Sequence, residues 1–406
     1  MEVHIVIGAN YGDEGKGLIT DGLSSRLINE GKRVCVVRFN GGAQAGHTVQ
    51  TPEGVRHVFH HFGAGSLAGA NTHLAQRFVV HPMLFRGERE ELLKVNANTE
   101  ISIDPRAIIT LPMDVMINQE IEFFRSQNRH GSCGVGFGEA VNRNESGLPK
   151  FKLSIMDLIH LDRQEVYHRW NSIVNEYVPS RLKQLGLDDG CLDKYAENLY
   201  EEGFERFMED CQYLLKNSSI ALPCYIDGHD ALILEGAQGL ALDEEIGHFP
   251  YVTRSKTGLP WALEFLNQCS STRIEANVWY LTRAYATRHG AGPLEAEAET
   301  MELPDFEDQT NVHNDFQGSI RLAPLDIEAL ERRINKDLDR SNILLGKVYL
   351  KTGIAVSCLD QMKINLLLSQ KRVRETVSFS EWLKIRLGVE NKIESWGPSR
   401  KTLNFY

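Results

Sequence analysis

The sequence GANYGDEGKGLIT, residues 8–20, decides how the first part of the chain folds. It follows the apolar run VHIVI, residues 3–7, and leads into a segment in which Ile19, Leu23 and Leu27 recur at helical spacing. A strand, a glycine-rich turn and a helix in this order are typical of a phosphate-binding loop, because backbone N–H groups and the positive end of the helix attract anions. We therefore expect an anion site in this loop.

The loop departs from a Walker loop, since Asn10 and Gly17 stand where the pattern GxxxxGK[ST] requires a glycine and a hydroxyl residue. Lys16 supplies a positive charge for a phosphate group. Asp13 requires another explanation, because a carboxylate beside phosphates needs an intervening cation or a proton on which to act. The alternative hypothesis is a solvent-exposed turn, since Gly, Asp and Asn are common turn formers.

Strand and helix signals alternate beyond this loop. Residues 33–39, RVCVVRF, predict a second strand that completes a β-α-β unit, and the runs at 231–234 and 278–281 predict two more strands. We expect an α/β fold with a large, central, mostly parallel β-sheet flanked by helices. No linker or repeat divides the chain, so 1–406 is predicted to be a single domain, with a helical insertion at about 157–222 where apolar residues follow a helical stripe.

The composition argues against several classes of protein. The chain has 406 residues and a formal net charge of −11, which disfavours nucleic acid as a partner, because phosphate backbones are bound by basic surfaces. Its seven cysteines are scattered without a CxxC pair or metal-ligand spacing, which indicates reduced thiols and a cytoplasmic protein. No apolar run approaches the roughly 18 residues that a membrane span requires, so we expect no membrane partner.

Two more glycine-rich segments follow predicted strands. The run FNGGAQAGHT, residues 39–48, contains His47, and the run LEGAQG, residues 234–239, is followed by Asp243 and Thr253. A histidine of near-neutral pKa suits a general acid, although a single loop histidine more often makes a structural hydrogen bond. Because ligands bind at the carboxyl ends of parallel strands, we expect the three loops to form one site.

Five motifs together resemble the adenylosuccinate synthetase family, in the family's order and over almost the full chain. They are GDEGKG at 12–17, NGGAQAGHT at 40–48, LEGAQG at 234–239, TRHGAGP at 287–293 and SWGPSR at 395–400. The resemblance implies a P-loop-NTPase-like adenylosuccinate synthetase fold. It also implies a ligase of purine nucleotide biosynthesis that joins L-aspartate to the 6-position of inosine monophosphate (IMP), with GTP as phosphoryl donor, Mg²⁺ as cofactor and a homodimer as the assembly.

The resemblance assigns catalytic roles that the chemistry supports. A 6-oxopurine has no leaving group until its oxygen is phosphorylated. In the family, the residue at the position of Asp13 takes the N1 proton and contacts Mg²⁺, and the one at the position of His47 assists the 6-oxygen, so that the pair acts as base and acid. Lys16 would stabilise the transferring phosphoryl group. Gln238 completes the catalytic set, and the backbone of Gly46 is implied as a second metal ligand.

Binding residues carry over from the matching motifs. The residues that the resemblance implies for the donor nucleotide are Gly12, Gly15, Lys16, Gly17, Thr48, Asp360, Ser395, Gly397 and Pro398. Those implied for the acceptor nucleotide are Asn40, Gln44, Ser132, Arg143, Gln238 and Thr253. Arg143 stands at the place of an arginine that reaches a neighbouring subunit's nucleotide.

Two departures from the family concern the substrates. The aspartate loop TGRxRR is replaced by NVHNDFQGSIR, residues 311–321, which leaves Arg321 as the carboxylate partner and Asn311 as a second aspartate-binding residue. The guanine-reading TKLD is replaced by SCLD, residues 357–360, which keeps Asp360 but loses the lysine. ATP is therefore an alternative to GTP as donor.

Three hypotheses for the function remain open. The complete GDEGKG hexapeptide favours ordinary chemistry with IMP as acceptor. Gln44, where the family usually has asparagine, and Cys133 in the adjacent acceptor loop favour a changed acceptor, such as deoxyguanylate (dGMP), on which divergent phage members act to give 2-aminodeoxyadenylosuccinate. The third hypothesis is a catalytically silent nucleotide-binding regulator, which the loss of the arginine-rich loop permits and the retention of Asp13 and His47 argues against.

Overall fold

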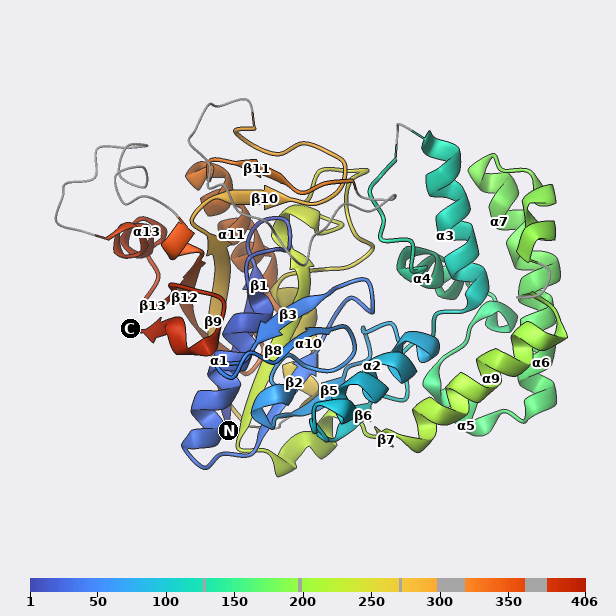
Figure 1. The fold of residues 1–406 in the computed structure, drawn as a ribbon, viewed down its shortest axis with the longest axis horizontal. Helices are drawn as coiled ribbons and strands as arrows, with labels where there is room; N and C mark the ends of the chain where they lie inside the picture. Colours follow the sequence, from blue (N-terminus) through green and yellow to red (C-terminus); the bar gives the residue numbers. More distant parts are fainter. Residues whose placement is uncertain (127–128, 196–198, 270–271, 298–317, 362–377) are drawn as a thin grey trace.

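The computed structural model describes residues 1–126, 129–195, 199–269, 272–297, 318–361 and 378–406 (Figure 1). Within these ranges ten strands form one sheet in the order β14-β13-β12-β9-β1-β8-β2-β5-β6-β7, and two ribbons pair β3 with β4 and β10 with β11. The strands are β1 (Glu2–Gly8), β2 (Val34–Arg38), β3 (His47–Gln50), β4 (Arg56–Phe59), β5 (Asn71–Leu74), β6 (Ile101–Ile103), β7 (Ser219–Ile220), β8 (Ala231–Gly239), β9 (Ile274–Arg283), β10 (Ala286–Arg288), β11 (Arg321–Ala323), β12 (Val348–Ser357), β13 (Asn391–Ser395) and β14 (Leu403–Phe405).

Neighbouring strands of the large sheet run parallel, except β13 and β14, which are antiparallel. The α-helices are α1 (Lys16–Asn29), α2 (Pro82–Lys94), α3 (Pro112–Arg125), α4 (Phe137–Glu145), α5 (Ile155–His160), α6 (Arg163–Ser172), α7 (Val178–Leu185), α9 (Glu201–Lys216), α10 (Leu259–Cys269), α11 (Ile327–Ser341) and α13 (Phe379–Leu387). The predicted α/β fold, with a mostly parallel sheet flanked by helices, is confirmed.

Strand β1 lies in the middle of the sheet and is buried on both faces. Val3, Ile5 and Ile7 belong to a core that α10 and α11 complete, whereas Val6 packs on the other face in a core that includes Leu23 of α1. Alternate residues of a strand point to opposite faces, so both faces are covered only if nearly every residue is apolar. This explains the continuous apolar run before the first glycine-rich loop.

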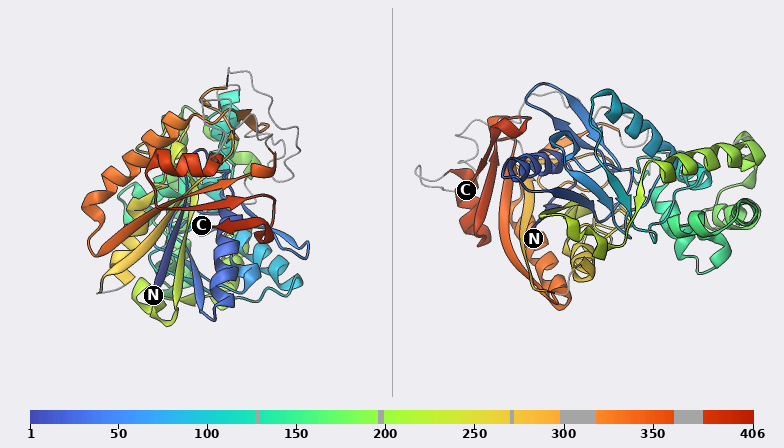
Figure 2. Two further views of the ribbon diagram at one scale, coloured as in Figure 1. Left: turned by 90° about the vertical axis from the view of Figure 1, so that its left-hand side faces the viewer. Right: turned by 90° about the horizontal axis from the view of Figure 1, so that it is seen from below.

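The helices from α3 to α9 form a layer beside the sheet, which projects from it in the view from below (Figure 2). In α9, the residues Phe204, Phe207, Cys211 and Leu214 are buried at spacings of three and four, as one face of a helix requires. The helical region that we expect at about 157–222 is thus part of a larger helical layer, which begins with α3.

Among the described residues, no helix combines the length and the apolarity that crossing a bilayer demands. Among the described residues, no disulfide joins any two of the seven cysteines.

Candidate active site

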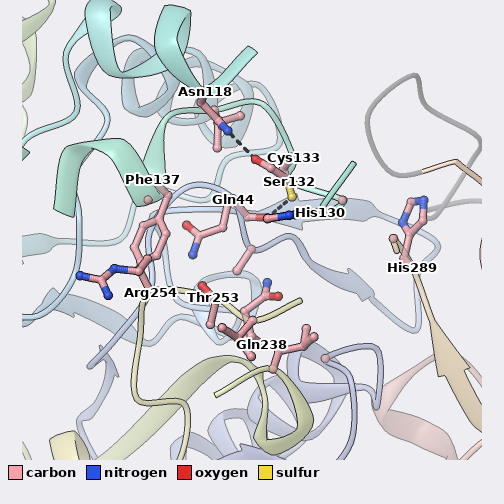
Figure 3. Close-up of a pocket in the computed structure, with 18 of the residues that line it drawn as sticks. Gln44, Asn118, His130, Ser132, Cys133, Phe137, Gln238, Thr253, Arg254 and His289 are labelled. Atoms are coloured by element: carbon pink, nitrogen blue, oxygen red, sulfur yellow. Dashed lines mark hydrogen bonds between the residues drawn. The ribbon is translucent and has the colours of Figure 1, made fainter. Parts of the chain in front are cut away.

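A cavity of roughly 760 Å³ lies where the loops that follow β1, β2 and β8 meet the helical layer (Figure 3). Parallel strands bring their carboxyl ends to one edge of the sheet, and β8 pairs with both β1 and β2. The cavity therefore collects residues from segments that are far apart in the sequence. The sequence-predicted site residues that line it are Gly12, Asp13, Gln44, Gly46, His47, Ser132, Gln238 and Thr253.

The loop between β1 and α1 is folded around its own carboxylate. Glu14 is buried and accepts hydrogen bonds from the backbone N–H groups of Asn10, at 3.0 Å, and Gly12, at 2.8 Å. Lys16 is also buried; its Nζ donates to the carbonyl of Gly12 at 2.6 Å and lies 3.4 Å from Glu14. Glu14 thus holds the loop closed and neutralises Lys16, a structural role that the sequence reasoning did not assign.

Gly12 is required where the first loop meets the end of β8. Its φ of 112° is unfavourable for other residues, and an added Cβ would lie 3.3 Å from the Cα of Gln238. Gln238 itself has a φ of 65°, a conformation that costs free energy in a non-glycine residue and is often found at functional sites. The close approach of the two backbones places Gln238 beside Asp13 in the cavity wall.

Asp13 follows this contact and lines the cavity, half-buried. Its backbone carbonyl accepts a hydrogen bond from the side chain of Arg283, at the end of β9. Arg283 thereby ties the first loop to the neighbouring strand, and so helps to hold the Asp13 main chain at the edge of the cavity.

His47, the first residue of β3, is paired with a buried carboxylate. Its Nδ1 lies 2.8 Å from Oε1 of Glu235, and both residues are buried. The backbone N–H of Ala64 donates to the other oxygen of Glu235, and Arg38 lies 3.8 Å from it. Burial opposes the ionisation of Glu235, but His47 and Arg38 hold its pKa below the ordinary value.

The pairing with Glu235 determines the chemical state of His47. Burial lowers the pKa of His47 to about 4, although Glu235 acts in the opposite direction, so the ring is neutral at pH 7. An ionised carboxylate only accepts hydrogen bonds, so Nδ1 carries the proton and Nε2 presents a lone pair. The sequence reasoning missed Glu235, although its place in LEGAQG, at the end of a predicted strand, was a signal for it.

The residues predicted for the donor nucleotide lie outside this cavity, except Gly12. Gly17 lies in the first turn of α1 and packs against β3, so that an added Cβ would come within 2.7 Å of the carbonyl oxygen of Thr48. Ser395 ends β13, and its hydroxyl donates to the carbonyl of Gly397 at 2.9 Å. Asp360 is exposed just after β12.

Asn40 is not among the residues that line the cavity, and its role in acceptor binding stays a prediction. Its Oδ1 accepts from the backbone N–H of Ala237 at 2.8 Å, and its Nδ2 donates to the carbonyl of Lys256 at 3.0 Å. The side chain is fully buried. Asn40 therefore ties the end of β2 to the β8 loop, and its hydrogen-bonding capacity is used within the protein.

Arg143 is likewise bonded within the protein. Its side chain is fully buried, and its Nε and Nη2 bind both oxygens of Asp114 at 2.9 Å. Its Nη1 and Nη2 donate to the carbonyls of Phe151 and Ile109, each at 2.7 Å. Every branch of the guanidinium is engaged inside the helical layer, so a contact with a neighbouring subunit's nucleotide would require some of these bonds to break.

The acceptor loop between α3 and α4 forms one wall of the cavity (Figure 3). The hydroxyl of Ser132 donates to Oδ1 of Asn118 on α3 at 2.9 Å, and Cys133 donates to the carbonyl of Gln44 at 3.5 Å. These contacts connect the acceptor loop both to the helical layer and to the loop that carries His47. Neither Asn118 nor the Cys133 contact was predicted from the sequence.

Arg321 does not line the cavity. Its Nη1 binds both carboxylate oxygens of Glu297, at 2.9 and 2.8 Å, and its Nη2 donates to the carbonyls of Gly290 and Gly292. The predicted carboxylate partner of aspartate thus already holds a carboxylate of the chain itself. The other predicted aspartate-binding residue, Asn311, lies outside the described residues.

Four buried polar atoms in the cavity wall have no hydrogen-bond partner among the described residues. They are Nε2 and Oε1 of Gln44, Nε2 of His47 and Nε of Arg288. A buried polar group without a partner costs about 1–3 kcal/mol, so such atoms mark places where a ligand group is expected. An amide and an imidazole from the segment that follows β2, and a guanidinium from the end of β10, therefore line the same cavity.

The donor set of the cavity suits Mg²⁺. The carboxylate of Asp13 and the backbone oxygen of Gly46 are hard oxygen ligands, and both residues line the cavity. Within the described residues, no group of three or more His, Cys, Asp or Glu side chains could hold a metal by itself. Mg²⁺ in nucleotide enzymes is usually held by one or two carboxylates together with substrate phosphates and water, so the two residues fit it.

Comparison with known proteins shows to which family this chain belongs. The family model described as adenylosuccinate synthetase matches residues 5–347. The chain is 28% identical over 397 residues to the adenylosuccinate synthetase of Thermoplasma acidophilum, and the alignment covers 97% of this chain and 85% of that one.

Two solved structures have similar folds. One is the fully ligated adenylosuccinate synthetase of Plasmodium falciparum, with a TM-score of 0.66 and 18% identity over 100% of both chains. The other is the cyanophage S-2L succinoaminodeoxyadenylate synthetase bound to dGMP and to dATP as an energy donor, with a TM-score of 0.59 and 14% identity over 100% of this chain and 95% of that one. At these identities the likeness concerns the fold alone.

Proposed function

We propose that this chain, which belongs to the adenylosuccinate synthetase family, joins L-aspartate to C6 of IMP with a nucleoside triphosphate as phosphoryl donor. Membership of the family makes the chain an aspartate-ligating purine nucleotide synthetase, a carbon–nitrogen ligase. The observation that carries the proposal for the acceptor chemistry is the meeting of Asp13, His47 and Gln238 in the wall of one cavity. Three separate glycine-rich loops contribute these residues.

In this proposal, Asp13 takes the N1 proton of the purine, so that negative charge develops on the 6-oxygen as it attacks the γ-phosphorus of the donor. His47 faces that oxygen with Nε2. The negative charge beside it raises the pKa of the imidazole, so that Nε2 takes up a proton from solvent as the complex forms, and Glu235, at 2.8 Å from Nδ1, stabilises the imidazolium. His47 then donates from Nε2 to the oxygen, which becomes the leaving phosphate when the amine of aspartate attacks C6.

Two further elements support phosphoryl transfer. Bound Mg²⁺ would neutralise the phosphate oxygens, and the residues placed to hold it are Asp13 and Gly46. Lys16 belongs to the same loop, but its Nζ is bonded to Gly12 and lies beside Glu14. Its proposed contact with the donor therefore requires that Nζ exchange the carbonyl of Gly12 for a phosphate oxygen.

A second acceptor, dGMP, is supported by Gln44. Its amide carries both a donor and an acceptor without partners, and it extends into the cavity beside Phe137 and Thr253 (Figure 3). The phage enzyme of similar fold is bound to dGMP and to an adenine nucleotide as energy donor. The alternatives of this proposal are thus dGMP in place of IMP, and ATP in place of GTP. The pairing of His47 with Glu235 argues against a silent regulator, which has no need of a positioned imidazole.

To test this, the purified protein is incubated with Mg²⁺ and aspartate and with each combination of one acceptor (IMP, GMP or dGMP) and one donor (GTP or ATP). Phosphate release and the mass of the product are measured. We expect release and a succinyl adduct with IMP. Release with dGMP alone would establish the second acceptor. Release in no combination would contradict a catalytic function and support the regulator.

A homodimer and a cytoplasmic location complete the proposal. The first rests on the family, and the second on the scattered spacing of the seven cysteines, which is typical of reduced thiols. Light scattering of the purified protein tests the assembly.

A further inference from the structure

Arg288, at the end of β10, is a buried cation in the cavity wall. Its side chain is 1% exposed. Its Nη1 donates to the carbonyl of Pro293 at 2.6 Å and its Nη2 to that of Tyr251 at 3.3 Å, and its guanidinium carbon lies 4.6 Å from the centre of the Tyr11 ring. Its Nε has no partner, and no carboxylate of the described residues lies within 4.0 Å of the guanidinium.

The other cavity arginines whose partners are known each have a carboxylate. Arg125 pairs with Glu122 at 2.8 Å. Arg181 binds both oxygens of Glu139, at 2.8 and 2.9 Å, and Arg254 pairs with Glu145 at 2.5 Å. Relative to these three residues, Arg288 is the arginine that lacks an anion, although it is the most deeply buried of them.

The pairing of β10 with β11 further destabilises the positive charge of Arg288. Arg288 lies directly opposite Arg321, and like charges in such a cross-strand pair repel. Glu297 is bonded to Arg321, whereas Glu295, the carboxylate that acts on Arg288 from a distance, is itself bonded to Tyr11 and Arg333. Burial lowers the pKa of Arg288, which shows that its charge is poorly solvated. A desolvated cation is stabilised by an anion that hydrogen-bonds to it, and a guanidinium fits a carboxylate with two parallel bonds.

We propose that Arg288 binds a carboxylate group of the substrate aspartate in this cavity. The proposal rests on the proposed function, which requires aspartate to reach C6 beside Asp13. Arg288 stacks on Tyr11, two residues before Asp13, so an amino acid held there lies next to the reacting centre. Arg321, whose guanidinium is bound to Glu297, Gly290 and Gly292, instead supports the turn that follows Arg288.

The first test compares the effects of the same substitution at Arg288 and at Arg321. Arg288→Lys should raise the Michaelis constant for aspartate by about 10- to 100-fold, because an ammonium cannot form the two-pronged contact, and change those of both nucleotides by less than about threefold. Arg77→Lys, at a surface pair with Glu264, is the assay control. Three outcomes would overturn the proposal. Arg321→Lys could raise the Michaelis constant for aspartate more than Arg288→Lys does, or Arg288→Lys could raise the constants of all three substrates equally. Arg288→Lys could also raise the constant of the acceptor nucleotide alone, since its phosphate is the other available anion.

The second test does not need turnover. Succinate, a dicarboxylate without the reactive amine, is titrated into the protein while the midpoint of thermal unfolding is followed. We expect succinate to stabilise the wild type, and Arg288→Met and Arg288→Lys to abolish this effect while nucleotide stabilisation persists. If no nucleotide pair supports turnover, the proposed function fails, but this loss still supports Arg288 as a carboxylate site. Equal stabilisation of wild type and Arg288→Lys refutes the site whatever the turnover.

Discussion

Nδ1 of His47 lies 2.8 Å from Oε1 of Glu235, so a buried carboxylate sets the proton position on the histidine that faces the substrate cavity. Arg38 and the backbone N–H of Ala64 hold the carboxylate in place. The carboxylate leaves Nε2 without the proton and favours the charged imidazole, which the proposed reaction requires. Glu235 is thus a positioning residue that acts through His47.

We expect Glu235→Gln to lower kcat by about 100-fold or more and to change the Michaelis constant of the acceptor only a few-fold. The amide can donate to Nδ1, which moves the ring proton to Nε2, and a wrong tautomer is costly in comparable triads. Steady-state kinetics with nitrogen chemical shifts of the imidazole measures both effects. A variant with near wild-type kcat, or with an unchanged tautomer, would separate Glu235 from catalysis.

The depressed pKa of His47 predicts a pH dependence of stability. The ring titrates near its ordinary 6.5 in the unfolded chain and at about 4 in the folded protein, so the unfolded chain binds more protons between these values. This contribution to stability is complete above pH 6.5 and is lost as the pH falls toward 4. Wild type should lose roughly 1 to 3 kcal/mol more than His47→Gln over this interval, as measured by urea unfolding. Parallel pH profiles would contradict the lowered pKa; the other buried histidines are common to both proteins and cancel.

Asp13→Asn should lower turnover by about 100-fold or more while acceptor binding stays within a few-fold. The amide keeps the shape of the side chain but cannot take the N1 proton. Pre-steady-state phosphate release and calorimetric titration of the acceptor provide the two measurements. Near wild-type turnover would remove Asp13 from the mechanism.

Arg143→Leu should destabilise the protein by about 3 to 5 kcal/mol, because it leaves Asp114 buried without its partner. Burial already raises the pKa of Asp114 despite the arginine. The double variant Arg143→Leu/Asp114→Leu should recover part of the loss in chemical unfolding. Mixing Arg143→Leu with Asp13→Asn protein should restore no activity through subunit exchange; recovery after confirmed exchange would show that Arg143 acts across an interface.

Gln44→Leu should raise the Michaelis constant of the acceptor nucleotide about 10-fold, because the buried amide would lose its hydrogen bonds to the ligand. Gln44→Asn, which restores the residue usual in the family, should change the preference between IMP and dGMP. The constants for aspartate and for the donor serve as internal controls. Equal preference in wild type and both variants would show that Gln44 does not read the acceptor.

The sequence by itself determined the architecture and the location of the site. The apolar run before Gly8 predicts a strand, and the glycine-rich loops at residues 12–17, 40–48 and 234–239 predict a shared edge of the sheet. These features are local, because backbone conformation and periodic apolarity are encoded in neighbouring residues. Asp13 and His47 are titratable residues of these loops, and their predicted roles as base and acid come from the resemblance to the family.

Only the tertiary structure decided which side chains are available to a ligand. Asn40 and Arg143 lie in matching motifs, yet their polar atoms are used inside the protein, whereas Arg288 faces the cavity without an anion. Glu235 meets His47 across 188 residues of sequence. The hydrogen-bond partners of a polar side chain and its exposure to water depend on how distant segments pack. The free energy of a buried charge is therefore set by the groups that this packing brings within a few ångströms.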